Sequence, residues 1–147
     1  MSEPSALRFE MYKLYLETAE RVSDRRASAN AWMLSVNSAI VGLSSYLAPG
    51  EQTAPGRIWS AAVPIAGILV CIAWAALLTS YSKLNGAKFK VLHELEAELP
   101  SALFTLERTF YRQAGRRSLS RLELAVPWSF AALYAGLIVA TMALPPA

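Results

Sequence analysis

Cysteine and histidine are almost absent from this chain of 147 residues. Cys71 is the only cysteine and lies within an apolar run, so the chain forms no intramolecular disulfide and no cysteine metal cluster. His93 is the only histidine, and the residues around it lack a ligand spacing such as His-Glu-x-x-His. We therefore expect no metal and no cofactor, and we expect His93 to Glu96 to lie on a solvated helix face.

Recognisable catalytic motifs are also missing. The sequence has no glycine-rich phosphate loop, no Gly-x-Ser-x-Gly elbow and no carboxylate pair at a plausible pocket. Charged residues are excluded from the apolar runs, whereas proton relays and ion-coupled carriers need a titratable group at membrane depth. We expect a protein that is neither an enzyme nor a pump.

Apolar residues are abundant, at 54% of the chain, and they are gathered into blocks. Three runs without charge, 27–50, 58–82 and 124–147, contain 24, 25 and 24 residues. A helix needs about 20 apolar residues to cross a bilayer, and three such runs leave too little amphipathic chain to cover them in a soluble fold. The predicted fold class is an all-α membrane protein with three transmembrane helices.

The basic residues predict the orientation. Of the 14 Lys and Arg, only Arg57 lies between the first two runs, and the other thirteen precede the first run or lie between the second and third. Lys and Arg are retained on the cytoplasmic side. We therefore expect a multi-pass protein of the bacterial inner (cytoplasmic) membrane, with a cytoplasmic N-terminus and an outer C-terminus. Aromatic residues agree, because they fall near both predicted interfaces: Trp32, Tyr46, Trp59, Tyr81 and Trp128.

Proline positions predict long helices. No proline occurs from Ser5 to Tyr46, and Pro100 ends a second long helical stretch. A short loop between two long helices makes them antiparallel, which predicts a helical hairpin extended into the cytoplasm. The expected order is a cytoplasmic amphipathic helix (1–29) continuous with the first span (30–48), an outer loop (49–57), a second span (58–81), a cytoplasmic helical region (82–123), a third span (124–144) and an outer tail (145–147).

A polar face runs along the first span. Asn30, Asn37 and Ser44 are spaced by seven residues, and Ser38 lies in the adjoining column. Since an exposed carboxamide is unfavourable in lipid, Asn37 is expected to face another helix or water. We interpret this face as a helix interface, with pore lining as the alternative.

A second candidate site is a charge cluster at the predicted membrane surface, formed by Asp24, Arg25, Arg26, Lys83, Asn85 and Lys88. The two arginines can bind lipid phosphate, and Asp24 can pair with either lysine across the hairpin. A simple topogenic anchor is the alternative. Because glutamates alternate with the basic residues, membrane lipid explains the net charge of +3 better than nucleic acid does.

Short motifs also suggest a family. Tyr12-Lys13-Leu14-Tyr15, Ser23-Asp24-Arg25-Arg26, Asn30 and Ser35-Val36-Asn37 resemble the RipA-like family of small octameric bacterial cytoplasmic-membrane proteins. The likeness continues through Ser80-Tyr81, Leu84-Asn85, Lys88-Phe89-Lys90, Leu99-Pro100 and Val126-Pro127. This resemblance implies a homo-oligomer, an octamer, and supplies no catalytic or binding residues.

Three functions remain compatible with the sequence. We favour a non-enzymatic homo-oligomer with a scaffold or regulatory role. One alternative is an oligomeric channel or membrane-permeabilising effector, which is similar in outline to the two-span effector domains of bacterial conflict systems. The other alternative is an accessory subunit that binds a larger membrane protein partner.

Overall fold

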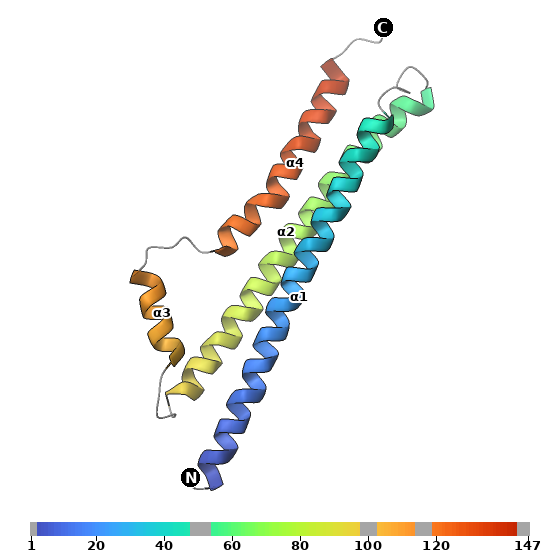
Figure 1. Ribbon diagram of the computed structural model, residues 1–147. Coiled ribbons are helices and arrows are strands. Elements are labelled where there is room, and N and C mark those ends of the chain that lie inside the picture. Colours follow the sequence, from blue (N-terminus) through green and yellow to red (C-terminus); the bar gives the residue numbers. More distant parts are fainter. Residues whose placement is uncertain (1–2, 48–53, 98–102, 114–118, 144–147) are drawn as a thin grey trace. The chain divides into compact units, whose positions relative to one another are not determined.

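The computed structural model describes residues 3–47, 54–97, 103–113 and 119–143. These residues form four α-helices: α1 (Glu3–Leu47), α2 (Ala54–Glu96), α3 (Leu103–Gln113) and α4 (Leu119–Ala143) (Figure 1). The predicted all-α class is confirmed for this part of the chain.

The helix boundaries follow the proline pattern, with one difference. α1 is a single helix of 45 residues, as the lack of proline after Ser5 predicts. α2 begins at Ala54, so Pro55 and Gly56 lie in its first turn, where the sequence predicted a loop. Proline suits a first helical turn because its missing N–H has no partner there in any case. The rest of the predicted outer loop and the tail at 145–147 lie outside the described residues.

Two of the helices are long and apolar enough to cross a membrane. They are the Ile58–Glu96 part of α2 and the Leu122–Ala143 part of α4. α1 has the length but does not reach the same hydropathy, because its charge-free run contains Asn30, Asn37 and five serines. A span within α1 therefore stays a prediction.

The chain divides into two compact units. We call residues 1–27 and 80–120 the polar unit, and residues 28–79 and 121–147 the apolar unit. Each unit contains a segment of α1 beside a segment of α2 (Figure 1). The polar unit also contains α3, and the apolar unit contains nearly all of α4.

The polar unit is held by a small core and by side-chain contacts between α1 and α2. Ala19, Val22 and Leu92 are buried. Lys88 Nζ donates to Thr18 Oγ1 at 2.9 Å and lies 4.9 Å from the centre of the Tyr15 ring. The long lysine stem thus packs against α1 while the ammonium group is bound by a hydroxyl and an aromatic face.

α3 is attached to this unit by an aromatic contact and a carboxylate cap. The Phe104 ring lies 6.4 Å from the Tyr12 ring and 6.2 Å from the Phe89 ring. Glu96 accepts hydrogen bonds from the Phe104 N–H at 2.6 Å, the Thr105 N–H at 3.1 Å and the Thr105 hydroxyl at 3.0 Å. The carboxylate thus satisfies two N–H groups of the first turn of α3, which lack partners within the helix.

The sequence predicted a solvated helix face from His93 to Glu96. This prediction is wrong at Glu96, whose side chain is only 1% exposed. Burial alone would raise the pKa of Glu96, but the hydrogen bonds from Phe104 and Thr105, with His93 at 3.6 Å, lower its pKa below the usual 4.5. Burial and the charge of Glu96 also raise the pKa of Tyr12. Glu96 is therefore a charged cap.

This cap gives a first prediction. We expect Glu96→Gln to destabilise the first turn of α3 by about 1–2 kcal/mol, because an amide accepts these hydrogen bonds more weakly than a carboxylate. Hydrogen exchange of the Phe104 and Thr105 amides measures the loss. Glu94→Gln, at an exposed position two residues earlier, is the matched control and should leave both amides protected.

The same cap depends on pH in a defined direction. Because the pKa of Glu96 is lower in the folded chain, its stabilisation is fully present above about pH 4.5 and is lost as the pH falls through the lowered pKa. Protection in the Glu96→Gln variant should lack this acid-dependent loss. Equal acid sensitivity in the variant and the native chain would contradict the assignment.

Candidate functional site

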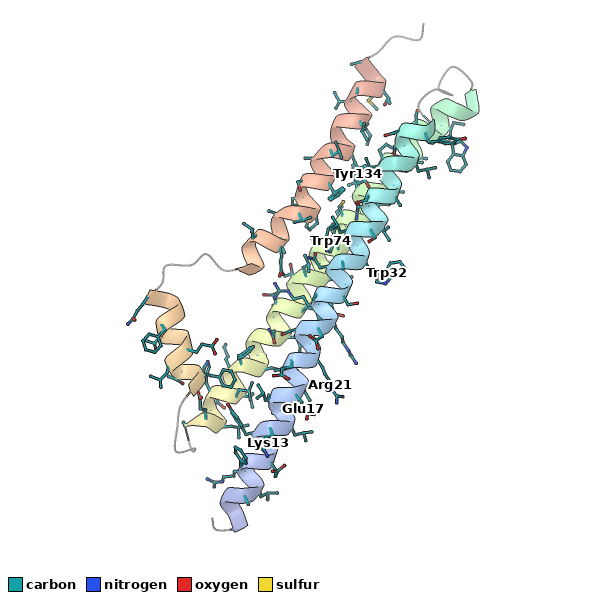
Figure 2. All side chains as sticks on the ribbon, in the orientation of Figure 1. Lys13, Glu17, Arg21, Trp32, Trp74 and Tyr134 are labelled. Atoms are coloured by element: carbon teal, nitrogen blue, oxygen red, sulfur yellow. The ribbon has the colours of Figure 1, made fainter. Side chains whose placement is uncertain are left out.

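The centre of the apolar unit is a polar contact between three helices. Asn37 of α1, Cys71 of α2 and Tyr134 of α4 are each at most 2% exposed. Trp74 of α2 is buried beside them, and Figure 2 shows Trp74 and Tyr134 directed between the helices. Trp32 of α1, in contrast, points away from α2 and is exposed.

Both the oxygen and the nitrogen of the Asn37 carboxamide form hydrogen bonds. Its Oδ1 accepts a hydrogen bond from Cys71 Sγ at 3.2 Å, and its Nδ2 donates to the Met33 carbonyl at 2.8 Å. The Tyr134 hydroxyl lies 3.0 Å from the Asn37 carbonyl oxygen and 3.3 Å from Oδ1, and donates its single proton to one of the two. These partners also fix the amide orientation, since a flipped amide would turn Oδ1 toward the Met33 carbonyl.

Close packing holds Tyr134 against α2. A Cβ atom added to Gly67 would lie 2.5 Å from Cζ of Tyr134 and 2.6 and 2.8 Å from two other ring atoms. Only glycine therefore leaves room for the ring at this position. The absence of a side chain at Gly67 brings the Tyr134 hydroxyl within reach of Asn37.

A second carboxamide contact lies two helical turns earlier on α1. Trp74 Nε1 donates to Asn30 Oδ1 at 3.1 Å, and the Trp74 ring lies 6.2 Å from the Phe130 ring of α4. Buried indole N–H groups need such an acceptor. Two asparagines on one face of α1 thus each bind a polar group of α2.

The polar face predicted from the seven-residue spacing is divided in the structure. Asn30 and Asn37 contact α2, and Ser44, which is partly buried, donates to the Ile40 carbonyl. Ser38 is exposed and donates to the Leu34 carbonyl, four residues back in its own helix. Three neighbours share its exposed side, and we call these four residues the serine row: Ser35, Ser38, Gly42 and Ser45.

The predicted charge cluster lies in the polar unit, where its members have different surroundings. Asp24, Arg25 and Lys83 are exposed, and Arg26 is half-buried. Lys88 donates to Thr18, as described above, and not to Asp24. Asn85 Nδ2 lies 3.4 Å from Ser23 Oγ.

The chemistry of these sites is that of binding between helices. Within the described residues, no three His, Cys, Asp or Glu side chains are grouped to hold a metal. The partners of Asn37 are a backbone carbonyl, a thiol and a phenol hydroxyl. Sequence reasoning identified the two asparagines but not Gly67, Trp74, Phe130 or Tyr134, since aromatic and glycine residues in an apolar run carry no signal of their contacts.

Two apolar helices of spanning length and the neutral polar contacts of the apolar unit fit a helical membrane protein. Residues 9–143 match the octameric membrane protein family, and the chain belongs to that family. The match confirms the resemblance seen in the short motifs. No curated protein and no solved structure matches the chain.

The contact at Gly67 gives a second prediction. We expect Gly67→Ala to push the Tyr134 ring away from α2 and to break its hydroxyl contact with Asn37, at a cost of about 1–3 kcal/mol for overpacking. Thermal unfolding of the purified protein in mild detergent measures this loss.

Gly136→Ala is the matched control, because a Cβ at Gly136 of α4 meets no atom within 4 Å. It introduces the same methyl group into a helix of the same unit, and alanine is the better helix former. The proposed contact is wrong if both variants unfold at the same temperature.

Proposed function

We propose that the chain assembles as a non-enzymatic homo-octamer in the bacterial inner membrane, where it serves as a scaffold or regulatory component. The observation that carries this proposal is the family match over residues 9–143. The family description supplies the octamer, and the lack of a catalytic constellation in the sequence supports a role in assembly.

The proposed topology has three spans, with residues 30–48 of α1 as the first. A cytoplasmic N-terminus, a cytoplasmic region at 82–123 and an outer C-terminus are supported by the thirteen basic residues that avoid the loop between the first two runs. The aromatic residues support the same topology, because four of the five rings near the predicted interfaces are exposed: Trp32, Tyr46, Trp59 and Trp128.

The serine row supports contacts between copies within the membrane. Ser35, Ser38 and Ser45 donate to carbonyls four residues earlier, so their hydroxyls need no outside partner. A Cβ at Gly42 would meet nothing within 4 Å. Small residues of this kind let a second helix approach closely, and they are poor at filling space against lipid. We propose that this row faces a neighbouring copy.

A conducting pore is the second candidate, and the same serine row is the observation that favours it. If the row faced the axis of the ring and not the next copy, its hydroxyls would line a polar path through the membrane. Asn37 contributes to neither arrangement directly, because its side chain is fully buried within its own chain.

The mass of the complex is the third prediction. We expect the protein purified in mild detergent to have a mass of about eight times the chain mass of 16.0 kDa once bound lipid is subtracted. Native mass spectrometry gives this value directly. A monomer or dimer would contradict the proposal, and a stoichiometric second protein would favour an accessory subunit of a larger complex.

The serine row gives the fourth prediction. Ser38→Leu should lower the octamer fraction at a given detergent concentration, because the larger side chain separates two closely packed helices. Ala66→Leu, at an exposed position of α2, is the matched control and should leave the octamer intact.

Conductance in planar bilayers separates the two candidates. A scaffold should give no single-channel current from either the native protein or the Ser38→Leu variant. If the native octamer gives a current and the Ser38→Leu variant does not, the protein is a channel and the scaffold proposal is wrong.

A further inference from the structure

Two apolar patches of the polar unit are exposed in the part of the chain that the structure describes. The first, which we call the α1 patch, consists of Leu7, Met11 and Leu14 on one side of α1, and they are 53–65% exposed. The second, the α3 patch, consists of Leu106 and Phe110, which are 53% and 66% exposed and lie four residues apart on α3. Clusters of large exposed apolar side chains indicate an interaction surface.

Both patches belong to the polar unit and lie outside the charge-free runs. The charge-free run of α2 ends at Ser82, and Glu96 lies 14 residues further along the same helix, about 21 Å at 1.5 Å per residue. Glu96 caps the first turn of α3, so the α3 patch begins near this end of α2 within the polar unit. On α1, Leu14 lies 13 residues, about 20 Å, before the run that starts at Ala27.

Ring symmetry favours a second copy as the partner. A closed ring of eight copies is built from head-to-tail contacts, in which each copy offers two different surfaces. The polar unit carries two such surfaces, one on α1 and one on α3. A two-fold contact would instead need one patch that is complementary to itself.

Charge complementarity favours the same pairing. Residues 3–21, around the α1 patch, contain four glutamates and three basic residues, whereas residues 103–121, from α3 to the start of α4, contain five arginines and one acidic residue, Glu107. Glu10 pairs with Lys13 and Glu17 with Arg21 on the exposed side of α1, at 3.2 and 3.8 Å (Figure 2). A contact between unlike patches joins a weakly acidic segment to a basic one, whereas a contact between two α3 patches would join two basic segments.

We propose that the α1 patch of one copy binds the α3 patch of the next copy around the octamer. The apolar side chains supply the buried area, and the surrounding charges select the head-to-tail pairing over the two like-with-like pairings. This inference rests on the proposed homo-octamer and names the surface through which its cytoplasmic part is joined.

Disulfide cross-linking between two chains that each carry one introduced cysteine tests the pairing. A Leu14→Cys chain and a Phe110→Cys chain carry different affinity tags, are co-expressed in one membrane and are oxidised there. The native chain is the background, because its only cysteine, Cys71, is buried. We expect a mixed dimer that contains both tags, and no cross-link when either variant is expressed alone. A chain that carries both cysteines should give a ladder up to the octamer.

The matched control is Glu20→Cys in place of Leu14→Cys, since Glu20 is exposed on α1 but lies outside the patch. This control should give no mixed dimer with Phe110→Cys.

Two results would overturn the proposal. Cross-links between two copies of the same variant would favour a two-fold contact. A lack of mixed dimers would overturn it in favour of lipid or another protein as the partner, provided that native mass spectrometry of the same sample still gives an octamer. Loss of the octamer in the native chain would instead refute the proposed function itself.

Discussion

The hydrogen-bonded carboxamide of Asn37 is the constraint on which the apolar unit depends. A carboxamide in an apolar environment is costly unless its oxygen and its N–H groups find partners. Here those partners come from Met33, Cys71 and Tyr134, so one side chain links three helices. The requirement explains why Gly67 lacks a side chain and why the Tyr134 ring lies against it.

The same constraint fixes the rotation of α1 about its own axis. With Asn30 and Asn37 turned toward α2, the regular 100° step per residue places Ser35, Ser38 and Ser45 on the exposed side. The surface that α1 offers outside the chain therefore follows from a contact inside it. A change at Asn37 would disturb this surface only through the position of the helix.

The sequence predicted the helices well because proline and charge act locally. The uninterrupted α1 and the apolar run of α2 follow from residues in the helices themselves. The faces were harder to predict. Asn37 and Ser38 share a polar character but lie on different sides of α1, and no spacing rule says which of two polar columns is covered by a neighbouring helix. Glu96 reads as an exposed helix residue, because its partners belong to α3, whose first turn lies beyond Pro100.

The two units stabilise their helices by different chemistry, and this follows from their composition. Contacts between the charge-free runs of α1, α2 and α4 involve neutral groups by necessity, which avoids the cost of placing an ion in a medium of low dielectric constant. In the polar unit, the Lys88 ammonium group lies against the Tyr15 ring and the Glu96 carboxylate caps α3. The strength of these two charged contacts depends on salt and pH. Any adjustment of the protein to ionic conditions should therefore begin at the cap of α3 and the charged side of α1, while the Asn37 contact stays unchanged.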